Sequence, residues 1–135
     1  MKILAMMAMT CVIAAGCTTA SYPPQPKSPV QRYTLTKPDI FVIRMGLLGS
    51  VRDPDSLVFG DAEAIKRGNG LIEVCGTVNG KNGFGGYTGF VPYNGILGPN
   101  SAGERVFVVA GFGDGGSGSQ AVLNLCREHG VLKPA

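Results

Sequence analysis

The sequence predicts a small α+β domain, in which an antiparallel sheet of about four strands is flanked by one helix before it and one after it. The chain has 135 residues, of which 44% are hydrophobic, and this is enough for one compact core. Its middle holds four strand-like segments, each bounded by Gly, Pro or Asn. A segment near the C-terminus repeats its apolar residues at helical spacing.

Charge and composition narrow the classes of partner. The chain has 12 Lys plus Arg against 9 Asp plus Glu, with no basic run, whereas nucleic-acid binding relies on clustered basic residues. A single His and scattered Cys disfavour a zinc site. We therefore expect no nucleic-acid partner, no metal and no cofactor.

Residues 1–16 have the pattern of a signal peptide. Lys2 provides a short basic start, and an apolar stretch runs from Ile3 to Ala15. This stretch of about 13 residues is too short to span a bilayer core, which needs roughly 20. We expect it to be removed.

The residues before Cys17, Ile-Ala-Ala-Gly, resemble the lipobox of bacterial lipoproteins. This resemblance implies that Cys17 becomes the N-terminus and carries several acyl chains, which anchor far more strongly than one chain. Thr18 rather than Asp follows, as in lipoproteins passed to the outer membrane. The expected location is the outer membrane, with the domain facing the periplasm. The alternative is an ordinary secretory signal cut near Ala15 or Ala20.

A Pro-rich spacer separates this predicted anchor from the domain. It favours an extended polyproline conformation rather than a packed element, because it contains Pro23, Pro24, Pro26 and Pro29. The expected organisation is a signal peptide over 1–16, the lipidated Cys and tether over 17–37, one domain over 38–131 and a tail over 132–135.

The domain is predicted to open with a helix. Thr36 suits the N-cap, Pro38 the first turn and Asp39 the third helical position. Residues 40–48 are apolar nearly all round, and their β-branched side chains also suit a buried strand, so both interpretations stay open. A turn follows over residues 53–56, where Pro fixes φ and Asp and Ser can bond nearby amides.

Strands are predicted over residues 57–66, 71–79, 87–92 and 105–111. In the second of them, alternation separates two faces. One face carries Ile72, Val74 and Val78, and the other carries Leu71, Glu73, Cys75, Thr77 and Asn79.

The last element is predicted as a helix over residues 119–129, ended by Gly130. One face of it carries Val122, Leu125, Cys126 and His129. Cys126 should therefore face the sheet, which contains Cys75. With Cys11 removed and Cys17 acylated, no other thiols remain in an exported protein, so a disulfide is the economical pairing. Two free buried thiols are the alternative.

Catalytic and cofactor motifs are weak. Residues 111–116 fit GxGxxG, but only 19 residues follow them, which leaves no second parallel strand for a dinucleotide site. His129 and Glu128 are sequence neighbours that point about 100° apart on a helix and form no dyad. His129 is better explained as a helix-end residue favoured by the dipole. Asp61 and Glu63 would share one face of a strand, and an ordinary solvent-exposed face explains this placement.

The stretch from Cys75 to Phe90 reads CGTVNGKNGFGGYTGF. With the DPDS turn at 53–56 and the Cys-bearing last helix, it resembles a group of small exported bacterial proteins of unassigned function. The resemblance covers residues 53–126, about half of the chain, and implies a fold and a location without an activity. This chain differs from the group in its longer glycine-rich segments at 96–103 and 111–118.

The glycines of this stretch leave a hairpin connection free to adopt positive φ. The polar and aromatic groups it displays would be those of a candidate recognition loop: Asn79, Lys81, Asn82 and Tyr87. The alternative is architectural, with the Asn side chains capping turn amides while Phe84, Tyr87 and Phe90 pack on the core.

These features predict a non-catalytic outer-membrane lipoprotein that binds an envelope protein or peptidoglycan, the cell-wall glycan. The alternative is a periplasmic inhibitor of a hydrolase, such as a lysozyme or protease, that inserts one loop into the enzyme. A third class is an enzyme that uses Asp61, Glu63 or Glu73 as close carboxylates in a cleft.

Overall fold

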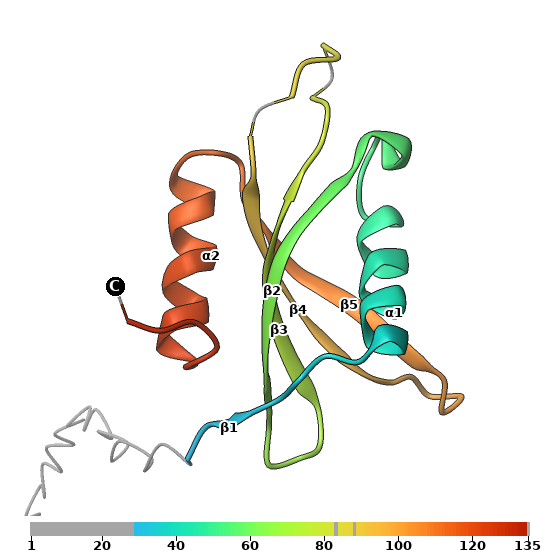
Figure 1. Ribbon diagram of the computed structural model, residues 1–135, viewed down its shortest axis with the longest axis vertical. Coiled ribbons are helices and arrows are strands. Elements are labelled where there is room, and N and C mark those ends of the chain that lie inside the picture. The colour runs from blue at the N-terminus through green and yellow to red at the C-terminus, as the bar shows by residue number, and fades with distance from the viewer. Residues whose placement is uncertain (1–28, 83, 88, 135) are drawn as a thin grey trace, which may run out of the picture.

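The computed structural model describes residues 29–82, 84–87 and 89–134. One antiparallel sheet has the order β1 (Gln31–Arg32), β2 (Val58–Lys66), β3 (Ile72–Asn79), β4 (Val91–Pro99) and β5 (Arg105–Phe112). Helix α1 (Lys37–Leu48) lies on one face and α2 (Ser117–Glu128) on the other (Figure 1). A short 3-10 helix, η1 (Pro54–Ser56), precedes β2. The predicted α+β class is confirmed.

Helix α1 begins at a capping box. The Thr36 side chain accepts a hydrogen bond from the Asp39 backbone (3.3 Å), and the Asp39 carboxylate accepts one from the Thr36 backbone (2.9 Å). The helical interpretation of residues 40–48 is confirmed. Gly46 allows α1 to approach β5 closely, because a Cβ there would lie 2.5 Å from the Phe107 carbonyl oxygen. Helix α1 therefore packs mainly on β5, at one edge of the sheet.

The two faces of β3 serve two cores, as its alternation predicts. The core under α1 contains Ile72, Val74 and Val78, and the core under α2 contains Cys75. Cys75 is bonded to Cys126 of α2, with 6.2 Å between their Cα atoms, so the predicted disulfide is confirmed. The disulfide spans 51 residues of sequence, and closing such a loop contributes about 4 kcal/mol in the chain-entropy model.

Strand β4 differs from its prediction. It begins at Val91 and continues to Pro99, whereas the sequence indicated a strand over 87–92 followed by a glycine-rich segment. The glycines are paired residues of this strand, and neighbouring side chains occupy the space that their Cβ atoms would need. A Cβ at Gly95 would lie 2.4 Å from Phe107 Cζ, and one at Gly98 would lie 2.5 Å from Leu71 Cδ2. These glycines make room for packing rather than end the strand.

The fifth strand, β1, lies within the segment that the sequence assigned to the tether. Gln31 pairs with Lys66 and Arg32 with Ile65 at the C-terminal end of β2. The Arg32 guanidinium also donates to the Val131 carbonyl and lies 3.1 Å from Glu63. These long-range contacts draw residues 31–32 onto the domain.

The predicted signal peptide, Cys17 and most of the Pro-rich spacer lie outside the described residues. Among the helices of the described ranges, none has the length and apolar character that a bilayer span requires.

Candidate functional site

The β3–β4 connection, residues 80–90, projects beyond one end of the sheet (Figure 1). It carries most of the predicted recognition residues. Asn79 ends β3, opposite Val58 of β2, and its side-chain oxygen is buried without a hydrogen-bond partner within the described residues. Lys81 and Tyr87 face each other in an isolated antiparallel bridge. The hairpin thus brings together residues that the sequence proposed as one site.

Asn82 builds the tip of the loop. Its backbone N–H donates to the Gly86 carbonyl (2.8 Å), and its side-chain oxygen accepts from the backbones of Phe84 (2.9 Å) and Gly86 (3.1 Å). Gly85 has a φ of +82°, and this backbone conformation would be strained for a residue with a side chain. This part of the architectural interpretation holds, because the Asn82 oxygen is already used by the turn.

The aromatic side chains of the loop point outward, so the expectation that they pack on the core is wrong. Phe84 is 100% exposed, Phe90 56% and Tyr87 53%. The Phe90 ring rests partly over Gly60 of β2, where a Cβ would lie 3.1 Å from Phe90 Cε1. The Lys81 ammonium lies 5.8 Å from the centre of the Tyr87 ring, within the range of a cation–π contact. The loop therefore displays three aromatic rings and one cation.

The base of the loop is held by the turn that precedes β2. The buried Ser56 hydroxyl accepts a hydrogen bond from the Lys81 backbone (3.0 Å) and donates to the Asp53 carbonyl (2.9 Å). The DPDS turn and the glycine-rich stretch, on which the resemblance to small exported proteins is based, are thus in direct contact. A groove of about 340 Å³ lies beside them, with Val78, Val91 and other apolar side chains in its wall.

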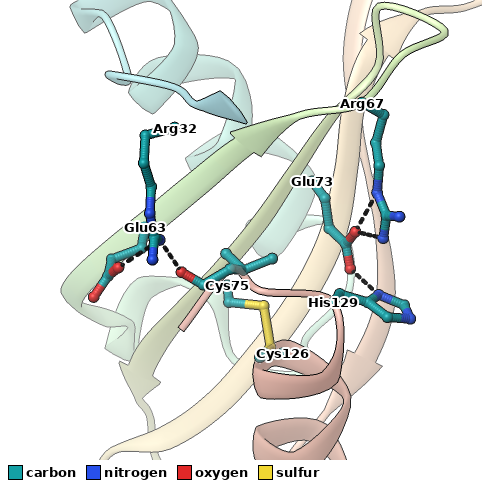
Figure 2. Close-up of a disulfide and its surroundings, with 8 residues drawn as sticks. Arg32, Glu63, Arg67, Glu73, Cys75, Cys126 and His129 are labelled. Atoms are coloured by element: carbon teal, nitrogen blue, oxygen red, sulfur yellow. Dashed lines mark hydrogen bonds and ion pairs between the residues drawn. A yellow bond between two sulfur atoms is a disulfide. The ribbon is translucent and has the colours of Figure 1, made fainter. Parts of the chain in front are cut away.

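A second cluster, which the sequence analysis missed, surrounds the Glu73 carboxylate (Figure 2). The Glu73 side chain is 3% exposed. One of its oxygens accepts from Arg67 Nε at 2.8 Å, and the other lies 2.5 Å from His129 Nδ1. In the sequence, His129 adjoins Glu128, whereas Glu73 lies 56 residues away.

The signal for this pair was present in the sequence. Glu73 precedes Cys75 by two residues and shares its strand face, while His129 follows Cys126 by three and shares its helix face. The Cys75–Cys126 disulfide therefore places Glu73 beside His129. The groove beside His129, about 460 Å³, has Lys66, Arg127 and Glu128 among its lining residues. Arg67 and His129 give the buried Glu73 carboxylate two hydrogen-bonding partners, as burial of a charge requires.

The other candidate carboxylates, Asp61 and Glu63, both lie on β2 and line the same groove. Glu63 forms an ion pair with Arg32, with 3.1 Å between their charged atoms. Among the described residues, no group of three or more His, Cys, Asp or Glu is arranged to hold a metal ion.

A buried carboxylate network fixes the start of α1. Asp39 lies 2.7 Å from Arg105 of β5 and accepts a hydrogen bond from the Tyr33 hydroxyl (3.0 Å). Burial by itself raises the pKa of Asp39, but the hydrogen bonds from Thr36 and these neighbours outweigh it and lower the pKa below its usual value. The hydrogen bond to Asp39 raises the pKa of Tyr33.

Comparisons of the chain with protein-family models, with curated proteins and with solved structures found no match.

Proposed function

We propose that this protein is a non-catalytic lipoprotein of the bacterial outer membrane that binds another envelope protein through its β3–β4 loop. The observation that carries the proposal is the complete exposure of Phe84 at the loop tip, with Tyr87 and Phe90 beside it. Buried aromatic side chains supply much of the binding energy at protein interfaces. A solvent-exposed aromatic side chain such as Phe84 can therefore contribute binding energy when a partner protein buries it.

The loop is prepared for binding by its own hydrogen bonds. Asn82 closes the tip and Ser56 holds the base, so less conformational entropy is lost on association. A fully exposed Phe84 at the tip suits an apolar pocket in a protein. A glycan platform would need free hydrogen-bonding groups beside the ring. The Asn82 oxygen next to Phe84 is already occupied by the turn, and the Lys81 ammonium lies against the Tyr87 ring instead.

The direction of the loop also supports a partner away from the membrane. The chain enters the sheet at β1, which pairs with Lys66 at the C-terminal end of β2. The loop follows Asn79, which pairs with Val58 at the other end of β2 (Figure 1). A lipid on Cys17 would thus tether the domain by one end and leave the loop at the opposite end.

The proposed location is supported by the lipobox-like residues 13–16 before Cys17 and by the disulfide. Disulfides persist in the oxidising periplasm, and Cys75 and Cys126 form one.

Crosslinking in intact cells tests this function. We compare the wild-type chain with Phe84→Ala and with the triple variant Asn79→Ala, Lys81→Ala and Tyr87→Ala. Phe41→Ala serves as the matched control, because Phe41 is an exposed aromatic on α1, away from the loop. We expect a crosslinked protein species that the loop variants lose and the control keeps. Crosslinks that are identical in all variants would remove the loop as a recognition site, and crosslinks to peptidoglycan would replace the protein partner by a glycan.

Inhibition of a hydrolase is a second candidate, favoured by the projection of Phe84 from a disulfide-tied domain. Such a loop suits insertion into an enzyme cleft. Titration against periplasm-directed lysozymes and proteases decides it, since an inhibitor would act at stoichiometric concentration and Phe84→Ala would relieve the inhibition.

A further inference from the structure

A groove on the α1 face of the sheet is separate from the loop. Helix α1 packs mainly on β5 and leaves the β2 side of this face open. A groove of about 500 Å³ lies there between α1, residues 33–35 and β2, and this volume is within the usual range of small-molecule sites. Much of its surface is apolar, with contributions from Ile40, Ile43, Phe59, Ala62, Ala64 and Tyr93.

Tyr93 lines this groove, and its hydroxyl has no hydrogen-bond partner within the part of the chain that the structure describes. The side chain is 3% exposed and packs edge-on against Phe107, with 6.1 Å between ring centres. The ring extends from β4 across β3, where a Cβ at Gly76 would lie 2.5 Å from the Tyr93 hydroxyl oxygen. Gly76 pairs with Ala62 of β2, so two small residues leave space around the hydroxyl. Burial raises the pKa of Tyr93 to about 12, which keeps the hydroxyl protonated.

Arg44 provides a second donor, with a positive charge. Its guanidinium lies 4.9 Å from the centre of the Phe59 ring, and in the described ranges it forms no ion pair with a carboxylate. Stacking on a ring leaves the N–H edges of a guanidinium free for a planar anion. Glu63 is occupied by Arg32, and Asp61 is the carboxylate that remains on the β2 rim.

We propose that this groove binds a small amphipathic carboxylate with an aliphatic body, of the size of a medium-chain fatty acid. The aliphatic body packs on Phe59, Ala62 and Ile40, while the carboxylate accepts hydrogen bonds from Arg44 and Tyr93. Two donors in a partly apolar groove select an acceptor, and the charge on Arg44 selects an anion. The site does not involve the β3–β4 loop, so it stands or falls independently of the proposed function.

The test is a titration of the full chain carrying Cys17→Ser, which removes the predicted acylation site, with sodium decanoate. Backbone amide shifts measured by NMR report both affinity and location. We expect saturable shifts confined to residues 33–35, 40–44 and 59–64. Decylammonium, which has the same chain length and the opposite charge, should bind at least about tenfold more weakly.

Variants separate the contributions to binding. Arg44→Gln should weaken decanoate binding by about tenfold, and Tyr93→Phe, which removes only the hydroxyl, by about fivefold. Ala62→Leu fills the groove without altering either donor and should abolish binding, while Phe84→Ala should leave it unchanged. Shifts that map to the loop or the outer face of α1, or equal binding of decylammonium, would overturn the proposal. Wild-type affinity in Tyr93→Phe and Arg44→Gln would do so as well.

Discussion

The backbone N–H of Lys81 donates a hydrogen bond to the side chain of Ser56, 25 residues earlier in the chain, over 3.0 Å. This contact joins the turn before β2 to the loop after β3, which are separate motifs in the sequence. The Ser56 hydroxyl in turn donates to the Asp53 carbonyl. The position of the proposed recognition loop is thus set by a residue outside it.

Replacing Ser56 by Ala should destabilise the domain. The variant leaves the Lys81 N–H without its partner in a partly buried position and leaves the Asp53 carbonyl only the hydrogen bond from the Ser56 backbone N–H. The expected loss is about 1–2 kcal/mol of unfolding free energy. Urea denaturation measures it. Ser50→Ala is the control, because the Ser50 hydroxyl bonds only the exposed end of α1, and its effect should be within about 0.5 kcal/mol. Equal effects of both variants would show that Ser56 does not support the loop.

The disulfide should account for a large share of the stability. The double variant Cys75→Ala and Cys126→Ala opens a 51-residue loop and should lose about 4 kcal/mol of unfolding free energy. Reduction of the wild-type protein by dithiothreitol should lower its denaturation midpoint in the same direction. A midpoint that reductant leaves unchanged in the wild type would contradict this prediction.

Gly95 tests the glycines inside β4. Gly95→Ala places a methyl group 2.4 Å from Phe107 Cζ and 2.5 Å from the Val108 carbonyl, and such overpacking should cost about 1–3 kcal/mol. Gly68→Ala is the matched control, because no atom lies within 4 Å of its Cβ position. It should be neutral or slightly stabilising. Thermal unfolding of the two variants side by side measures the difference, and equal midpoints would argue against the extended strand.

Asp39 should make stability depend on pH at the acidic end. Its pKa is lower in the folded protein than in the unfolded chain, where it is about 3.9. Its ionised form therefore stabilises the fold above that value, and this contribution is lost as the pH falls through the folded pKa. The difference in unfolding free energy between wild type and Asp39→Asn should accordingly be largest near pH 7 and shrink toward pH 3. A difference that is constant over this range would mean that ionisation of Asp39 does not contribute.

The local elements could be predicted from the sequence because their signals lie within a few residues. The cap at Thr36 and Asp39 depends on a three-residue spacing. The assignment of Val74 and Cys75 to opposite faces follows from alternation along a strand. The pairing of Cys75 with Cys126 followed from the same periodicities together with the small number of thiols left in the predicted mature chain.

The remaining features depended on the tertiary structure, because distant segments decide them. Gly95 pairs with both neighbouring strands, and the Phe107 ring occupies the space that a Cβ there would need, which no residue adjacent in the sequence indicates. Phe84 points into water although its hydrophobicity alone favours burial. The groove around Tyr93 exists because α1 packs on β5, where Gly46 allows close contact, and leaves the β2 side of the sheet uncovered. Sequence periodicity thus determined which face each residue occupies, while only packing between distant segments decided which of those faces are covered.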